Sequence, residues 1–246
     1  MRESTAAAKP TPAKDSRQRG GIPRVIAIDG PAAAGKSTVG RLIAARLGYP
    51  FLDTGAIYRA MTWTALHRGV DLSDDDALSD LAASLSIDVG PPATGSIEPC
   101  TIFVDGEDVT RFLRQPEVEA AVSLVSRVAG VREALVKVQR DLAGRNSVVM
   151  AGRDIGTVVL PEADLKVYLD ASVEERARRR YAELSALGMD LDEEDVLHDL
   201  SRRDRIDSER SVSPLRPSED AVAIDSDGLT LEEVVQRLAE LIEGSS

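Results

Sequence analysis

The sequence predicts an α/β protein of three layers, in which helices cover both faces of a five-stranded parallel sheet. Three observations lead to this fold class. A phosphate-binding loop motif at residues 30–37 joins an apolar run to a segment of helical periodicity. Four further short apolar runs alternate with helical segments along the rest of the 246-residue chain. A stretch at about 85–115 breaks this alternation, which indicates a small antiparallel insert.

The loop motif fits the pattern G-x-x-x-x-G-K-[ST] of nucleotide-binding loops. Residues 24–29 (RVIAID) before it are typical of a buried parallel strand, and residues 37–47 (STVGRLIAARL) predict a helix that ends at Gly48. Glycine lets the backbone curl around an anion, and the helix N-terminus adds its positive dipole. The residues expected to bind nucleotide phosphates are Gly30, Pro31, Ala32, Ala33, Ala34, Gly35, Lys36, Ser37 and Thr38.

Two side chains of this loop have chemical roles of their own. We expect Lys36 to reach the outer phosphates and the Ser37 hydroxyl to ligate Mg²⁺. The alternative is a glycine-rich structural turn. The strand before the loop and the helix after it argue against that alternative.

The next elements continue the pattern of strand and helix. A second strand is expected at 49–53, and Thr54–Gly55 is expected to turn it into a helix over 56–67. Another helix is expected over 72–85, with Ser73 as its N-cap.

The insert is predicted because the alternation of strands and helices is interrupted at about residue 85. Short β-like runs at 87–89 and 101–104 flank a loop rich in glycine and proline. Asp105–Gly106 is a hairpin signal that leads into a third run at 107–109. Two helices are expected to follow, over 116–128 and 131–142.

The remaining strands are expected at 148–151, 165–170 and 221–225. Ser172 with Glu175, and Thr230 with Glu233, have the spacing of capping boxes, which predicts one helix to about 187 and another to 242. The segment between them, at about 188–217, is dense in charge and rich in arginine.

Composition excludes several classes of function. The net charge of −12 argues against a general nucleic-acid or membrane binder. Cys100 is the only cysteine in the sequence, so an intramolecular disulfide and a cysteine-rich zinc site are excluded. No apolar run reaches the length of a membrane span, and the first residues lack the apolar region of a signal peptide, so we expect a cytoplasmic protein. We also expect a monomer. Residues 1–22 have the composition of a disordered tail, which leaves 23–246 as the folded domain.

Three motifs are expected at the carboxyl ends of strands, where open parallel sheets bind ligands. They are the loop at 30–37, the segment 53–59 (DTGAIYR) and the segment 152–154 (GRD). Arginines beside a phosphate loop indicate a second phosphorylated group, because guanidinium binds phosphate in a bidentate way. Phosphoryl transfer between two nucleotides would use all three motifs, with a mobile, arginine-bearing lid at 188–217 that excludes water. A solvated helix laced with salt bridges is the alternative for that segment.

The motif-bearing segments resemble those of bacterial cytidylate kinases, over about 25–244. The resembling segments are IDGPAAAGKST, LDTGAIYRA, VSRVAGVREAL, AGRDIGTVVLPEADLKVYLDAS and RRDRIDSERSVSPLRPSEDAVAIDS. The resemblance implies a P-loop kinase fold, with the insert as an enlarged monophosphate-binding region. It also implies transfer of the γ-phosphoryl group of ATP to CMP or dCMP with Mg²⁺, and no nucleic-acid or membrane partner.

The resemblance also assigns residue roles. Thr54 and Asp207 would hold the acceptor near its base and sugar. Ser123, Arg132 and Asp154 would read the cytosine, although Ser126 lies equally close to the motif, and Asp154 has an alternative role in holding Mg²⁺ through water. The catalytic and phosphate-binding side chains would be Lys36, Arg59, Arg153, Arg203 and Arg210.

Two other functions compete with this one. The first is a kinase for UMP, AMP or a small metabolite such as shikimate. The second is a nucleotide-dependent switch. The chain has no N-K-x-D guanine motif, and a switch would give the acceptor-side arginines no purpose.

Overall fold

The computed structural model describes residues 22–92, 100–144, 147–186 and 188–244. The expected disordered tail lies outside the described residues except for Ile22. The central sheet has the order β2-β6-β1-β7-β8, and every neighbouring pair is parallel, which confirms the predicted fold class. Its strands are β1 (Val25–Asp29), β2 (Phe51–Asp53), β6 (Val148–Gly152), β7 (Leu165–Asp170) and β8 (Val222–Asp225).

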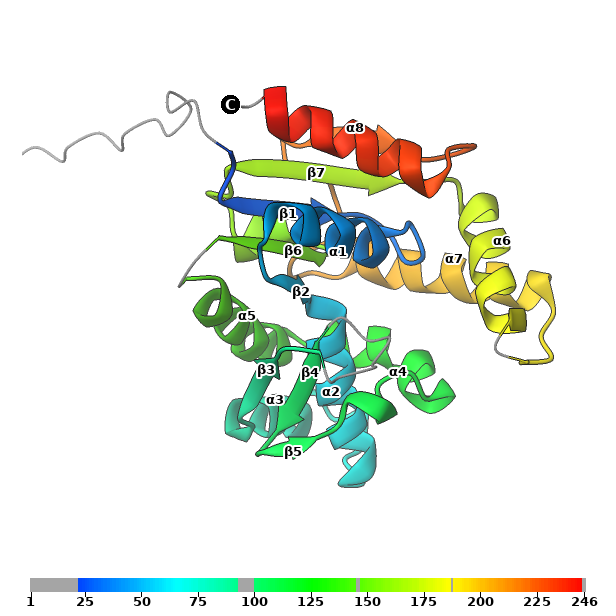
Figure 1. Ribbon diagram of the computed structural model, residues 1–246. Helices are drawn as coiled ribbons and strands as arrows, with labels where there is room; N and C mark the ends of the chain where they lie inside the picture. The colour runs from blue at the N-terminus through cyan, green and yellow to red at the C-terminus, as the bar shows by residue number, and fades with distance from the viewer. Residues whose placement is uncertain (1–21, 93–99, 145–146, 187, 245–246) are drawn as a thin grey trace, which may run out of the picture.

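Helices α1 (Lys36–Leu47) and α8 (Leu231–Gly244) lie over one face of this sheet (Figure 1). Ile26 and Ile28 of β1 point into this layer and are fully buried, while Ala27 between them belongs to the core of the opposite face. Alternate residues of a strand face opposite sides, so both sides of β1 must be apolar. The continuous apolar run read from the sequence reflects this burial on two faces.

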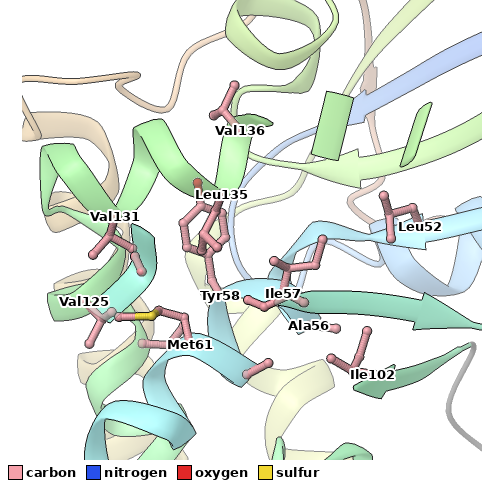
Figure 2. Close-up of a cluster of buried hydrophobic side chains, with 14 of the residues drawn as sticks. Leu52, Ala56, Ile57, Tyr58, Met61, Ile102, Val125, Val131, Leu135 and Val136 are labelled. Atoms are coloured by element: carbon pink, nitrogen blue, oxygen red, sulfur yellow. The ribbon is translucent and has the colours of Figure 1, made fainter. Parts of the chain in front are cut away.

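The opposite face carries α2 (Thr54–His67), α3 (Asp75–Ser84), α5 (Ala129–Ala143) and a one-turn π-helix (Ile155–Val159). Figure 2 shows part of this core, in which side chains of α2, α4 (Pro116–Ser126) and α5 meet Leu52 of β2 and Ile102 of the insert. The core therefore holds the insert firmly against the main domain.

The insert is a small antiparallel sheet of β3 (Ile87–Gly90), β4 (Thr101–Val104) and β5 (Glu107–Asp108), followed by a 3₁₀ turn at Thr110–Phe112. Asp105 and Gly106 both have positive φ, at 50° and 85°. Two such residues make the tight turn that matches strand twist, so the predicted hairpin is confirmed.

Helices α6 (Val173–Ala186) and α7 (Glu193–Glu209) pair beside the sheet and form the right-hand edge of the molecule in Figure 1. Ala32 of the phosphate loop is buried in one small cluster with Ala177 of α6 and with Val196 and Leu200 of α7. The charged segment expected as a lid is thus built around a long helix whose apolar side touches the loop.

Three local predictions need correction. Asp74, and not Ser73, caps α3, because its carboxylate accepts a hydrogen bond from the Ala77 amide while Ser73 hydrogen-bonds to Asp71. Thr54 and Gly55 form the first turn of α2, because the Asp53 side chain caps it.

At the start of α6 half of the predicted capping box forms. The Ser172 hydroxyl accepts from the Glu175 amide, but the Glu175 carboxylate binds Arg178 and Arg179. The box of Thr230 and Glu233 is complete, with hydrogen bonds in both directions. Across the described ranges, no helix has both the length and the apolar character needed to cross a bilayer.

Candidate active site

A cleft with a volume of about 360 Å³ opens at the carboxyl ends of β1, β2 and β6, between the phosphate loop, α4 and α7. Nine lysine or arginine side chains and five carboxylates line it. The chain as a whole carries a net charge of −12, so positive charge is concentrated in this cleft. Such a cleft attracts polyanions and is suited to phosphorylated ligands.

The phosphate loop owes its shape to backbone conformations that side chains disfavour. Gly30 has φ 148°, and a Cβ there would lie 2.0 Å from the carbonyl oxygen of Leu169 on β7. Ala33 and Gly35 follow with φ of 58° and 90°, which turns the backbone back toward the helix that begins at Lys36. This left-handed geometry is what directs successive amide groups toward an anion.

Lys36 lies under the loop and is buried. Its Nζ donates a hydrogen bond to the carbonyl oxygen of Pro31. Burial, with a further contribution from Arg153, holds the pKa of Lys36 well below its usual range, although nearby carboxylates oppose the shift. Phosphate oxygens next to Nζ would restore the charged form.

Ser37 and Asp53 meet at the mouth of the loop. The Ser37 hydroxyl donates to Asp53 Oδ2 at 2.9 Å, and Asp53 Oδ1 caps α2 by accepting from the Gly55 amide. Burial acts to raise the pKa of Asp53, but Arg59 and the Ser37 hydrogen bond outweigh it, so the pKa is lowered. An ionised carboxylate beside a hydroxyl offers the hard oxygen ligands that Mg²⁺ prefers.

Asp29, at the end of β1, clamps the start of the GRD segment's helix. Its two carboxylate oxygens accept from the amides of Ile155 and Gly156, both at 2.7 Å. Burial raises the pKa of Asp29 to about 6, against the opposing effect of those two hydrogen bonds. The clamp ties the strand that carries the phosphate loop to the segment that carries Arg153 and Asp154.

Arg132 and Asp154 form an ion pair deep in the cleft. Arg132 also donates to the Ser126 carbonyl oxygen, and its guanidinium lies over the Tyr58 ring at 5.2 Å from the centroid. Ser123 and Ser126 both line the cleft, so the predicted base-reading residues come together. Both serines line the cleft together with the ion pair, so the geometry does not choose between them.

Helix α7 adds charged groups from the other side. Arg153 Nε donates to Asp207 Oδ2 at 2.9 Å, and the Arg210 guanidinium lies 3.7 Å from a carboxylate oxygen of Asp207 and from one of Asp154. Arg203 pairs with Glu119 of α4 at 3.3 Å.

Glu119 joins the acceptor side of the cleft to α7. Its other oxygen lies 3.9 Å from Arg59, which itself lies 3.5 Å from Asp53. Burial acts to raise the pKa of Glu119, but Arg59 and Arg203 outweigh it and keep the pKa lowered. The two arginines are therefore held on either side of one carboxylate.

Several arginine nitrogens in this cleft are buried and make no hydrogen bond within the described part of the chain. They are Nε of Arg59, Arg132 and Arg203 and Nη2 of Arg210. Arg59 Nε and Arg210 Nη2 lie 3.9 Å and 3.7 Å from carboxylate oxygens, beyond hydrogen-bond distance. A buried donor without an acceptor costs free energy, which a bound anion would recover. A bound anion with several oxygens would supply the acceptors that these donors lack.

Most of the predicted site residues line the cleft, namely Ala32, Ala33, Gly35, Lys36, Ser37, Thr38, Thr54, Arg59, Ser123, Arg132, Arg153, Asp154, Arg203, Asp207 and Arg210. Gly30, Pro31 and Ala34 are not among the described residues that line the cleft, and Ala34 packs in the core with Val39 and Ile43 of α1. The Thr54 hydroxyl donates to the Ala151 carbonyl oxygen, which fixes α2 against β6.

The sequence reasoning did not assign Asp53, Arg114, Glu119, Arg179, Arg180 and Glu183, which also line the cleft. Asp53 had a usable signal, because it is the last residue of a strand, at the edge of the sheet where ligands bind. Arg114 lies in the turn before α4, and the other four lie on helices, where nothing in the sequence pattern says which charged side faces the cleft.

A family model described as cytidylate kinase matches residues 26–244. A cytidylate kinase of Geobacillus sp. (strain WCH70) is 52% identical over 217 residues, which are 88% of this chain and 95% of that protein. One of Pelotomaculum thermopropionicum is 51% identical over 213 residues, or 87% and 93% of the two chains. A solved shikimate kinase from Acinetobacter baumannii has a TM-score of 0.47 at 20% identity, and the match covers 92% of this chain and 96% of that one.

Proposed function

The chain belongs to the cytidylate kinase family and transfers the γ-phosphoryl group of ATP to CMP or dCMP; we propose that the charged cleft performs this transfer with the residues described above. The single observation that supports this assignment best is the set of orphaned buried donors on Arg59, Arg203 and Arg210, which line the same cleft as the phosphate loop and the Arg132–Asp154 pair. An acceptor phosphate bound by these arginines would lie between the ATP and the cytosine of the acceptor.

On the donor side, the loop amides and Lys36 would hold the β- and γ-phosphates of ATP. Ser37 and Asp53 would hold Mg²⁺, with phosphate oxygens and water as the other ligands, since Mg²⁺ keeps few protein ligands. Within the described ranges no three or more acidic, histidine or cysteine side chains form a group that could hold a metal ion. Bound Mg²⁺ would neutralise part of the phosphate charge.

On the acceptor side, Asp154 would accept a hydrogen bond from the N4 amino group of cytosine. Arg132 would donate to its N3 or O2 atom, because guanidinium offers donors and no acceptor. Ser123 or Ser126 would complete the base contacts, and Thr54 and Asp207 would lie near the base and sugar. The buried ion pair thus presents one acceptor and one donor in fixed positions.

The reaction needs positioning and charge stabilisation more than covalent chemistry. A phosphate oxygen of CMP attacks the γ-phosphorus, the bond from that phosphorus to the β–γ bridging oxygen breaks, and ADP leaves. Lys36, Arg153, Arg203 and Arg210 would surround the oxygens of the transferred group, where negative charge is spread in the transition state. Helix α7 would also exclude water, because Arg203 and Arg210 lie on the cleft side of α7 or at its end.

The test is release of ADP from ATP with CMP, dCMP, UMP, AMP or no acceptor. We expect rapid release with CMP and dCMP and slow release with the rest. Fastest release with UMP, AMP or a metabolite such as shikimate would show a different acceptor. Slow release that ignores every acceptor would favour a nucleotide-dependent switch.

Two further predictions concern the oligomeric state of the enzyme and its location in the cell. We propose that the enzyme acts as a monomer, which sedimentation at working concentrations would test. We propose a cytoplasmic location, which fractionation of cells would test. The net charge of −12 supports the prediction that nucleic acids and membranes are not partners.

A further inference from the structure

Arg176 of α6 joins three separate parts of the protein through one guanidinium. Its Nε donates to the Ala171 carbonyl oxygen after β7, at 2.9 Å, and its Nη1 donates to the Ala32 carbonyl oxygen in the phosphate loop, at 3.1 Å. Its Nη2 forms an ion pair with Asp204 of α7 at 2.7 Å. The residue is 5% exposed and is not among the described residues that line the cleft.

The surroundings make these contacts stiff. Ala32 packs with Ala177 of α6 and with Val196 and Leu200 of α7 in one small buried cluster. Charged hydrogen bonds are stronger in such a poorly solvated place, and one planar guanidinium fixes the relative direction of its three acceptors. If the Ala32 carbonyl moves, the guanidinium of Arg176 moves with it, and the ion pair between Arg176 and Asp204 of α7 changes.

Asp204 lies on the helix that carries the proposed phosphate-binding residues. It follows Arg203 directly and precedes Asp207 by three positions, so it lies about one turn from the side chain that holds Arg153. A helix moves as a unit over this distance. Fixing Asp204 consequently fixes where Arg203 and Asp207 point into the cleft.

We propose that Arg176 is a positioning residue that couples the conformation of the phosphate loop to the placement of α7. When ATP orders the loop, Arg176 holds α7 so that Arg203 meets the transferred phosphoryl group. The inference rests on the proposed role of Arg203. It differs from a purely structural role, in which Arg176 would stabilise α6 and α7 without affecting the contribution of Arg203 to the rate.

The first test measures kcat, KM for ATP and CMP, and the share of ATP lost to water, in Arg176→Met and Asp204→Asn. We expect kcat to fall about 10- to 100-fold, since misplacing a catalytic group by one ångström can cost about 10²-fold. KM for CMP should change little, and the share of ATP lost to water should rise. Arg178→Met is the matched control, because that arginine is exposed and pairs with Glu175 on its own helix; its kinetics should be unchanged.

The decisive test is a double-mutant cycle. Arg203→Ala should lower kcat strongly in the natural chain and much less in Arg176→Met, because Arg203 is already misplaced there. An equal fold-loss in both backgrounds would overturn the coupling. If Arg176→Met does not fold, Asp204→Asn takes its place in the cycle, since it leaves both carbonyl contacts of Arg176 intact.

The cycle also separates this inference from the function on which it rests. If Arg203→Ala leaves kcat unchanged in the natural chain, the proposed role of Arg203 is wrong. Arg210→Ala then replaces it in the same cycle, and equal losses with and without Arg176 again overturn the coupling.

Discussion

Arg132 and Asp154 form an ion pair in which the two side chains are 2% and 5% exposed, at the inner end of the cleft. Two charges buried together are costly to remove from water, and separating them is costlier still. A pair kept at this position, facing a cleft for nucleotides, presents a fixed donor and a fixed acceptor to whatever base enters.

The first prediction concerns base choice. Uracil places a carbonyl where cytosine has its amino group and an N3–H where cytosine has an acceptor, so it opposes both Asp154 and Arg132. An unpaired buried polar group costs ~1–3 kcal/mol, and two such mismatches give a preference for CMP over UMP of ~10² or more. The amide of Asp154→Asn can rotate to offer either a donor or an acceptor, so this change should narrow the preference, mostly by lowering kcat/KM for CMP. Kinetics with both acceptors test this.

The alternative role of Asp154 gives a different result in the same experiment. If the ratio of CMP to UMP efficiency holds while the Mg²⁺ dependence shifts, Asp154 serves the metal and the base is read elsewhere.

The second prediction is that Lys36→Met abolishes transfer without unfolding the protein. Methionine keeps much of the buried stem but cannot stabilise the charge on the outer phosphates, so kcat should fall by about 10²–10³ or more. Melting temperature should stay the same or rise, because burial already disfavours the ammonium group. Lys137→Met makes the same change at an exposed lysine and should leave both quantities alone. Near-normal turnover of Lys36→Met would contradict the role of the phosphate loop.

The third prediction concerns Mg²⁺. Asp53→Asn keeps an oxygen that can cap α2 but removes the negative charge beside Ser37. The Mg²⁺ concentration for half-maximal rate should rise about tenfold, since charge-assisted contacts are the stronger ones. Asp74→Asn is the matched control, because it changes the cap of α3 in the same way at a distance from the loop. An unchanged Mg²⁺ requirement in Asp53→Asn would assign the metal to other ligands.

The fourth prediction concerns pH and stability. Burial raises the pKa of Asp29 to about 6 from an ordinary value of 3.8, with repulsion from Asp154 adding to it and attraction to Lys36 opposing it. Between these two values the folded state binds more protons than the unfolded state, so the contribution of Asp29 to the free energy of unfolding falls as pH rises from about 4 to about 6.

Melting temperatures of the natural chain and of Asp29→Asn check this prediction. Between pH 4.5 and 6.5 the melting temperature of the natural chain should fall relative to that of Asp29→Asn. Asp71 is exposed and has a lowered pKa, so Asp71→Asn should show a constant difference over the same range. A constant difference for Asp29→Asn as well would mean that its pKa is not raised.

The sequence was most informative where a pattern is local, although the cap at Ser73 and half of the box at Ser172 and Glu175 did not form. The phosphate loop, the hairpin at Asp105–Gly106 and the box at Thr230 and Glu233 each depend on residues a few positions apart, and each formed as predicted. Ser73 was the wrong cap because two neighbouring positions both offered an oxygen. Local sequence does not say which of them reaches the helix amides.

Contacts between distant segments could not be predicted in this way. Glu119 and Arg203 lie 84 positions apart, and Arg176 meets Ala32 across 144. Such contacts depend on how helices rotate as they pack, and charged residues on both sides of α6 look alike in the sequence. The family resemblance supplied the roles of Arg132 and Asp154, but the buried clamp at Asp29 became visible only from the fold.

The strand order has a consequence for how the protein is made. β1 lies between β6 and β7, so the first strand of the chain pairs only with segments that begin at Val148 and Leu165. While the ribosome synthesises the first 147 residues, β1 and β2 have no neighbouring strand from the central sheet. Parallel pairing between such distant segments is slow, and unpaired apolar strands are prone to aggregate. A nascent chain or fragment that stops before β6 would hold the whole phosphate-loop sequence and still lack a phosphate site.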